Sequence, residues 1–478
     1  MKLMKTLVAL MMALFCLPAV AQQASYAKYT SGLPFRMTEV KAPVIPANQV
    51  SLSDYGAKGD GLALCTEAFQ KAIADLSGRG GGHLNVPQGV WLTGPIKLQS
   101  NIDLHLENGA IILFSGDIRL YPVIETTYEG GKRMRSMSPI TGTGLTNVSI
   151  TGHGVIDGNG ACWRPLKKEK VTESQWKKIT GDGGVFPRPT MWYPSEERVN
   201  TRPVMVHLEN CKNVLLQGVI FQNSPAWNIH PLMCENLIVD GITAKNPAYA
   251  QNGDAIDVES CKNVLIVNST FDAGDDCICI KSGRDAEGRQ RGMPTQNVVV
   301  SGCTVFNGHG AFVVGSEMSG GVKNIMVRDC QFIGTDAGLR FKSCRGRGGV
   351  VEKIYIQDIS MFNILGDAIT FDLYYGGKSV IETREDGTKV NNIEPKPVDV
   401  TTPEFRDISI SRVNCHGARR AIFFNGLPEK PISNVTLTDI NIVADEGADY
   451  FNCQNVVKKD VTVNIPKSKG NDKTVTPL

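Results

Sequence analysis

The stretch that decides the fold is "KNVLLQG", residues 212–218, because its pattern returns along the chain: a polar residue, Asn, an aliphatic residue, any residue and a second aliphatic residue. Further copies are "ENLIVDG" at 235, "KNVLIVN" at 262, "QNVVVSG" at 296, "KNIMVRD" at 323 and "SNVTLTD" at 433, with degenerate forms at 146, 352 and 406. The asparagines from Asn213 to Asn324 are 23, 27, 34 and 27 residues apart. Short strands that repeat at such intervals are typical of a parallel β-helix.

The repeated asparagine is expected to have a structural role. Equivalent residues of successive coils stack at about 4.8 Å, the spacing of paired strands. The sequence therefore predicts an asparagine ladder at a turn, and we assign it no chemistry.

One helical pattern precedes the repeats. Residues 66–76, "TEAFQKAIADL", place Ala68, Phe69, Ala72, Ile73 and Leu76 on one side, and a glycine-rich "GRGGGH" ends the pattern. A β-helix has an open apolar end that this helix would cover. A β-sandwich or a propeller would not combine an N-terminal helix with coils of variable length. We therefore predict an all-β, single-stranded right-handed parallel β-helix with a short N-terminal capping helix.

Residues 1–21 have the pattern of a secretory signal peptide. A basic start is followed by an apolar run from Leu7 to Leu17 and by the small-residue cleavage pattern Ala19-Val20-Ala21. The run is too short for a membrane span, and an N-terminal anchor is the alternative reading. The prediction is export, to a periplasm or out of the cell, and no later stretch is long and apolar enough to span a bilayer.

The remaining boundaries follow from the repeats. We expect an N-terminal extension at 22–48, one catalytic β-helix domain at 49–465 and a C-terminal tail at 466–478. Two long excursions, at about 120–140 and 157–200, interrupt the coils.

Composition limits the partners. Removal of the signal takes away two lysines and no acid, so the formal net charge falls from +2 to 0. A balanced chain argues against bulk binding of nucleic acid or of a membrane surface. Twelve cysteines remain, whose pairing cannot be deduced, and none has zinc-ligand spacing. We expect no cofactor, no metal and a monomer.

A second series of short strands carries the polar residues of interest. Its rungs are "AWNIHP" at 226, "AIDVES" at 255, "CICIKS" at 277, "AFVVGS" at 311, "GLRFKS" at 338 and "AITFDL" at 368. Strand alternation puts positions two and four in the core, for example Trp227 and Ile229, and positions three and five outside. The outer face then collects His230, Asp257, Lys281, Arg340 and Lys342. Of these, Lys281 is expected to be solvated, and His230 to be either a groove residue or plain surface.

Three acids and a histidine come just before three adjacent rungs. In register, Asp254 stacks beside Asp276, and Asp275 stacks beside His309. A pure strand would send Asp275 and Asp276 to opposite faces, so a turn or bulge after Gly274 is needed to aim both into one groove.

Such a cluster suits glycoside hydrolysis. Crowded acids cannot all be ionised, so at least one pKa rises, and a raised acid beside an ionised base is the required pair. The cations Arg340 and Lys342 would offset the acids and grip a substrate carboxylate, which suggests an acidic sugar. Turn-forming aspartates and a calcium site are the alternatives.

At these residues the chain resembles the polygalacturonases, glycoside hydrolase family 28. The motifs are "NGD" at 252–254, "GDD" at 274–276, "GHG" at 308–310 and "RFK" at 340–342, and "SDYGAKGDG" from Ser53 is also similar to the family. Each motif alone is weak, but four in order on a repeat scaffold are specific. The resemblance covers about residues 50–450, with Gly253 and Phe341 as mild departures.

The resemblance implies a metal-independent, inverting hydrolase of α-1,4-linked galacturonic acid. Asp275 would be the general acid, Asp254 and Asp276 would activate water, and His309 would support the acid. The residues expected to bind substrate are Arg340, Lys342, Asn252, Asp257, Tyr374 and His230.

Within the family, two features resemble exo-acting members. The interval from Asp276 to His309 is 33 positions and contains a charged loop, and the 157–200 excursion carries Trp163, Trp176 and Trp192. Both would wall one end of the groove, so we expect action at the non-reducing end of the chain. A rhamnogalacturonan-directed hydrolase, a pectate lyase and a non-catalytic carbohydrate-binding β-helix remain alternatives.

Overall fold

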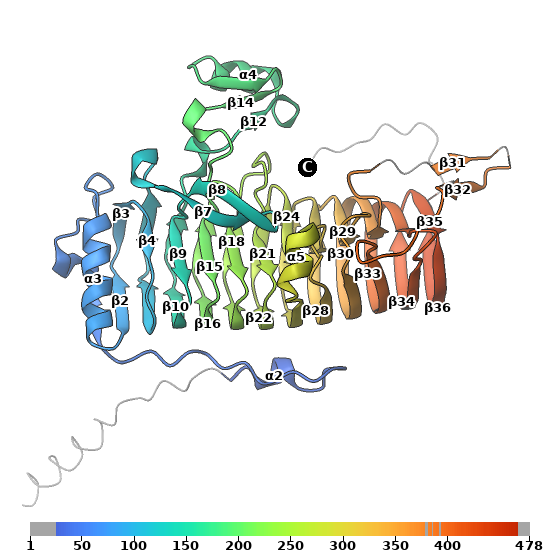
Figure 1. The fold of residues 1–478 in the computed structure, drawn as a ribbon, viewed down its shortest axis with the longest axis horizontal. Coiled ribbons are helices and arrows are strands. Elements are labelled where there is room, and N and C mark those ends of the chain that lie inside the picture. The colour runs from blue at the N-terminus through green and yellow to red at the C-terminus, as the bar shows by residue number, and fades with distance from the viewer. Residues whose placement is uncertain (1–24, 378–380, 385, 392, 467–478) are drawn as a thin grey trace, which may run out of the picture.

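The structure, a computed structural model, describes residues 25–377, 381–384, 386–391 and 393–466. The predicted signal peptide lies outside the described residues, as does all but the first residue of the predicted C-terminal tail. Parallel strands stack coil upon coil in one long sheet, which confirms the predicted right-handed parallel β-helix (Figure 1).

Three columns of paired strands form the coils. The first column is β1 (Gln49–Ser51), β2 (Gly82–Val86), β5 (Ile102–Leu106), β10 (Thr146–Gly152), β16 (Lys212–Gln217), β19 (Glu235–Asp240), β22 (Lys262–Val267), β25 (Thr295–Ser301), β28 (Val322–Ile333), β30 (Val350–Asp372), β33 (Glu404–Asn425), β34 (Ile432–Val443) and β36 (Cys453–Asn464). The second column is β4 (Ile96–Lys97), β9 (Ile140–Thr143), β15 (Val206–Glu209), β18 (Ile229–Leu232), β21 (Ile256–Glu259), β24 (Asp276–Lys281), β27 (Gly310–Val314), β29 (Ala337–Lys342) and β35 (Glu446–Phe451), with the ends of β30 and β33 between the last two. The third column is β3 (Gly89–Thr93), β6 (Ala110–Phe114), β11 (Val155–Asp157), β17 (Ile220–Gln222), β20 (Thr243–Lys245), β23 (Thr270–Ala273) and β26 (Thr304–Asn307).

The predicted asparagine ladder is present in the first column. Side-chain amides donate from coil to coil, for example from Asn213 Nδ2 to Asn147 Oδ1 and from Asn236 Nδ2 to Asn213 Oδ1, both at 3.0 Å. The ladder runs without a break from Asn101 to Asn324. Each of these asparagines has a positive φ, between 54° and 60°, which asparagine tolerates better than most residues. The same residue thus sets the turn and links the coils.

The helix α3 (Thr66–Gly78) covers the N-terminal end of the coils, as predicted (Figure 1). Its apolar side is buried against the first strands, with Phe69, Ala72 and Leu76 fully inaccessible to solvent. A short helix, α2 (Ala27–Thr30), belongs to an N-terminal segment that runs along the outside of the coils, where Tyr26 and Tyr29 pack against first-column residues.

One predicted core residue is misplaced. Trp227 lies outside the main core, where its ring packs on Tyr128 with 4.7 Å between ring centroids. The register explains the error, because Ile229 and not Trp227 pairs with Ile256 of the next coil. The predicted register of the rung at 226 was therefore wrong by two residues. Ile229 takes the second position of this rung, and His230 takes the third position instead of the fifth.

Two excursions rise from one edge of the coils (Figure 1). The first is an antiparallel hairpin of β7 (Val123–Tyr128) and β8 (Gly131–Ser136). The second, residues 157–203, is called the insertion below. It contains the helix α4 (Glu173–Thr180) and a small sheet of β12 (Leu166–Lys167), β13 (Val185–Arg188) and β14 (Met191–Tyr193).

The charged loop after β24 is also structured, since it forms the helix α5 (Asp285–Arg291). A further hairpin pairs β31 (Ile381–Thr383) with β32 (Lys389–Asn391). The twelve cysteines of the described residues are all free thiols. No helix in the described part of the chain is both long and apolar enough to cross a membrane.

Candidate active site

Three carboxylates meet beside the second column of strands. Asp254, Asp275 and Asp276 each place an oxygen within 4.8 Å of the other two. The pairing of Asp276 with Gly310 brings the neighbouring coil into line, so that His309 Nδ1 lies 3.1 Å from Asp275 Oδ1. The structure thus brings together the four residues that the sequence placed at one edge of three coils.

The backbone at Gly274 makes this convergence possible. The residue lies in a bend between β23 and β24, and a Cβ atom there would stand 2.5 Å from the carbonyl oxygen of Pro247. A side chain would therefore clash with the neighbouring coil. The bend continues into Asp275, whose Oδ1 accepts from the backbone N–H of Asp276 at 3.1 Å. Asp276 then begins the strand, so both acids reach the same groove.

Asp276 is the ionised member of the cluster. Burial would raise its pKa, but two cations outweigh burial and hold the pKa below its ordinary value. Lys342 Nζ lies 2.5 Å from Oδ2, and Arg340 Nη1 lies 3.3 Å from Oδ1. Both predicted carboxylate-gripping residues therefore already bind an acid of the protein.

In Asp254 burial favours the protonated form. Burial raises its pKa well above the ordinary value, and the negative charges of Asp257 and Asp275 add to the effect. Its Oδ1 atom has no hydrogen-bond partner within the described residues. Two carboxyl groups with opposite pKa shifts thus stand side by side, an arrangement that can hold a water molecule and take its proton.

His309 lies at the open side of the cluster. Its hydrogen bond to Asp275 raises its pKa and so favours the imidazolium form. Lys170 Nζ, from the insertion, reaches to 3.3 Å of Nε2. The insertion therefore extends over the active site.

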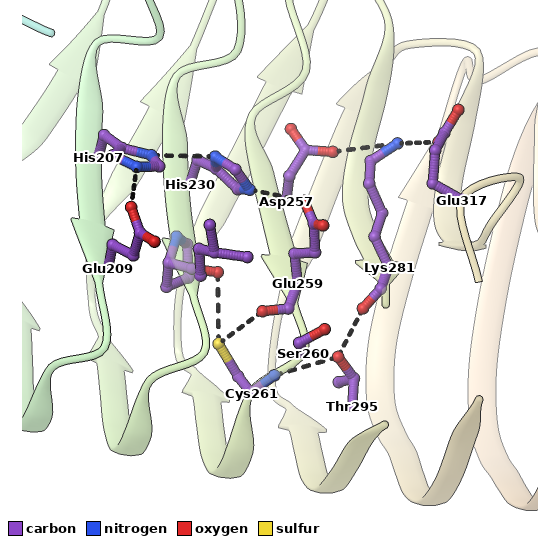
Figure 2. A network of polar contacts seen from close by, with 12 residues as sticks. His207, Glu209, His230, Asp257, Glu259, Ser260, Cys261, Lys281, Thr295 and Glu317 are labelled. Atoms are coloured by element: carbon purple, nitrogen blue, oxygen red, sulfur yellow. Dashed lines mark hydrogen bonds and ion pairs between the residues drawn. The ribbon is translucent and has the colours of Figure 1, made fainter. Parts of the chain in front are cut away.

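Asp257, Lys281 and Glu317 form a second group of charged side chains (Figure 2). Lys281 Nζ stands 3.4 Å from Asp257 Oδ1 and 3.0 Å from Glu317 Oε2. The expectation that Lys281 is solvated was wrong, because the side chain is buried and its Nζ lies 4.8 Å from the ring centroid of Trp227. Glu317 has its pKa lowered to about 2, since Lys281 and Lys342 outweigh the effect of burial.

His230 is not at the groove surface. It is completely buried, and its Nε2 lies 2.9 Å from Glu259 Oε2 (Figure 2). Arg291 Nη1 donates to the other oxygen of Glu259 at 2.6 Å. His207 stacks on its other side, with 3.2 Å between the two Nδ1 atoms. In this structure His230 supports the floor of the groove and makes no surface for substrate.

Asp257 is expected to make the folding stability of the protein depend on pH. Burial raises its pKa to about 8, against 3.8 for the free group, so the folded state binds more protons between these values. Stability is therefore expected to fall as pH rises from about 4 to about 8. Asp257→Asn should remove more than about 1.4 kcal/mol of this fall, the value of one pKa unit. Urea unfolding of both proteins at pH 5 and pH 8 measures the difference, and an unchanged fall in the variant would contradict it.

A cavity of about 430 Å³ opens over the three acids. Asn252, Asp254, Asp275 and Asp276 line it. Of the adjacent tyrosines, Tyr375 lines the cavity, whereas Tyr374 lies in the core with its ring beside Arg345. The predicted substrate-binding Tyr374 therefore does not line this cavity, whereas its neighbour Tyr375 does. Neighbouring side chains in "LYYGGK" point to opposite sides, and the sequence alone does not show which of the two tyrosines faces the cavity.

The sequence reasoning missed other residues of the cavity. They are Glu129, Arg284, Glu317 and Arg347. Glu129 and Arg284 come from segments without repeat pattern, so no register argument could place them. The three aspartates also have the spacing of a cation site. However, Lys342 and Arg340 occupy both oxygens of Asp276, so the protein itself already supplies cations there.

The fold and the site agree with comparison to known proteins. A family model described as glycosyl hydrolases family 28 matches residues 78–463. The chain belongs to glycosyl hydrolases family 28. It is therefore a glycosidase, and the lyase and the non-catalytic alternatives are set aside.

Relatives within glycosyl hydrolases family 28 support this assignment. A probable polygalacturonase of Vitis vinifera is 33% identical over 407 residues, which cover 83% of this chain and 74% of the relative. An exo-poly-alpha-D-galacturonosidase of Dickeya chrysanthemi is 29% identical, and the matched residues cover 68% of this chain and 57% of the relative. The crystal structure of an exopolygalacturonase from Thermotoga maritima superposes with a TM-score of 0.72 at 34% identity, covering 88% of this chain and 94% of that one.

Proposed function

We propose that this glycosidase hydrolyses α-1,4-linked galacturonic acid in polygalacturonate, the backbone of pectin, with inversion, from the non-reducing end of the chain. The observation that carries the proposal is the meeting of three carboxylates and His309 on a floor that also holds Arg340 and Lys342. The leader pattern of residues 1–21 supports export to the substrate.

In the proposed mechanism Asp275 protonates the leaving oxygen. It is the most exposed of the three acids, and its Oδ1 lies 3.1 Å from His309 Nδ1, a contact that positions the side chain. Asp254 and Asp276 hold the attacking water. Arg340 and Lys342 lie beside Asp276 and attract the carboxylate of the sugar.

The stereochemical outcome needs its own test. The nearest oxygens of the three acids lie within 4.8 Å, whereas two-carboxylate inverting sites usually separate the groups by roughly 6.5–9.5 Å. Here a pair of carboxylates holds the water instead of one, so that rule does not transfer directly. Family membership supports inversion.

Closure of the groove supports exo-action. The tip of the β7–β8 hairpin crosses to α5, where Gly130 O accepts from the N–H of Arg284 at 3.3 Å and Glu287 Oε2 accepts from the N–H of Lys132 at 3.1 Å. Lys170 of the insertion reaches His309 from above. Both walls are packed structures that would stop a polymer from passing through.

Polygalacturonate and rhamnogalacturonan oligomers, compared side by side, test the proposal. We expect reducing ends to appear on polygalacturonate with little loss of viscosity, because each cut removes only a chain end. Proton NMR of the fresh product should show the β-anomer. A fast drop in viscosity would contradict exo-action, an α-anomer would contradict inversion, and activity restricted to rhamnogalacturonan would contradict the substrate.

A further inference from the structure

A second cavity, of about 550 Å³, lies between the β7–β8 hairpin and the insertion. Glu129 and Asn252 line both this cavity and the one over the three acids, so the two spaces adjoin. We call it the cationic cavity after the charged side chains in its wall, which are Arg133, Arg135, Lys167, Arg188 and Arg202. Glu129 is the one acid among the described residues that line it.

These five cations differ from others near the active site in having no counter-ion. Among the residues that the structure describes, no carboxylate lies within 4.0 Å of any of them. Cations of the neighbouring cavities are paired, as Arg347 is with Asp285 at 2.6 Å and Arg420 with Asp367 at 2.8 Å. Even Glu129 lies closer to Arg284, at 3.8 Å, than to these five. Five positive charges in this cavity are thus left without a paired carboxylate among the described residues.

Two of the five cations, Arg135 and Arg202, are buried, so the absence of an anionic partner destabilises them. Arg135 Nε donates to the carbonyl oxygen of Arg202 at 2.8 Å, and Arg202 Nη2 donates to Asn252 Oδ1 at 2.6 Å. All of these acceptors are neutral. Burial lowers the pKa of Arg135, as expected for a cation without a counter-ion. Arg135 also lies over the ring of Tyr128, 3.6 Å from its centroid, but neither buried arginine has an anionic partner among the described residues. A buried charge without a counter-ion destabilises a protein unless a ligand supplies one.

We propose that the cationic cavity binds the carboxylate of the terminal sugar of the substrate, one residue beyond the sugar held over the three acids. The inference rests on the proposed function, because it takes the chain to be a polygalacturonate that ends in the closed part of the groove. A uronate carries the anion that the five cations lack, and arginine binds carboxylates with two parallel hydrogen bonds.

The arrangement of the two cavities sets the product. With one sugar over the acids and the terminal sugar in the cationic cavity, the bond cut is the second from the end. The enzyme then releases a digalacturonate and not a single galacturonic acid. Asn252, fixed by Arg202, lies at the junction where the two sugars would join.

Binding to a catalytically impaired protein tests this without hydrolysis. In the Asp275→Asn background, calorimetry compares galacturonic acid, digalacturonate and the neutral α-1,4-linked galactose disaccharide. We expect digalacturonate to bind at least about tenfold more tightly than the other two, because a charged hydrogen bond contributes that much or more. Adding Arg133→Gln and Arg188→Gln, both exposed side chains, should abolish this preference.

Lys178→Gln is the matched control. Lys178 is an exposed cation of α4 in the same insertion but does not line the cavity, so its loss should leave the preference intact. Equal binding of mono- and digalacturonate would overturn the inference, as would a preference that survives the arginine substitutions. Monomer as the first product of the unmodified enzyme on polygalacturonate would overturn it too, while leaving the proposed function standing.

Discussion

Replacement of Asp275 with Asn is expected to lower kcat on polygalacturonate at least about a hundredfold, the contribution of a positioned general acid. The substitution keeps the shape of the side chain and removes its ionisable proton. Asp275 is partly exposed, and an amide oxygen can still accept from the N–H of Asp276 and from His309, so the fold should be unaffected. Steady-state release of reducing ends measures the effect.

Asp272→Asn serves as the control for that experiment. Asp272 precedes the same bend by two residues, and its carboxylate accepts from Asn307 Nδ2 at 2.8 Å away from the three acids. The control variant should keep near-normal kcat and unfold at the same denaturant concentration as Asp275→Asn. Near-normal turnover of Asp275→Asn would refute the role of this residue as the acid.

Replacement of Lys281 with Met is expected to have the largest effect on stability. The substitution keeps most of the volume but leaves the carboxylate of Glu317 in the interior without its cation. Breaking a buried ion pair in this way typically costs about 3–5 kcal/mol. That is a large part of the stability of a typical protein, which is about 5–15 kcal/mol. Equilibrium unfolding in urea measures the change.

Lys262→Met is the matched comparison, since Lys262 is a half-exposed lysine that pairs with Glu235 at 3.8 Å. Loss of such a surface pair should cost no more than about 1 kcal/mol. Adding Glu317→Gln to Lys281→Met should recover part of the lost stability, because it removes one uncompensated charge. Equal effects of the two lysine substitutions would mean that the buried group contributes little.

The fold could be predicted because the repeated asparagine has two structural roles, and its repetition is visible in the sequence. An asparagine that both adopts positive φ and bonds the next coil returns in every copy of "KNVLLQG", so its positions mark the coils directly. The candidate catalytic residues then followed from register, since Asp254, Asp275 and His309 each stand just before a strand of that register.

The failures share a physical cause. In the rung at 226 two apolar residues, Trp227 and Ile229, both fit the inward position, and only strand pairing identifies Ile229. Lys281 was expected in solvent because its partner Glu317 is 36 residues away, in a loop without repeat pattern. Periodicity predicts which residues share a column, but it does not show which long-range loop covers them.

The asparagine ladder also shows that the stacking of the coils does not depend on the insertion. Asn213 bonds Asn147 at 3.0 Å although 66 residues separate them, and Asn236 bonds Asn213 at the same distance across only 23. The whole insertion is looped out between two adjacent coils without disturbing their stacking. Evolution can therefore lengthen, shorten or exchange this wall while the acids keep their places. The residues of the candidate site and the shape of the wall beside it can therefore change separately.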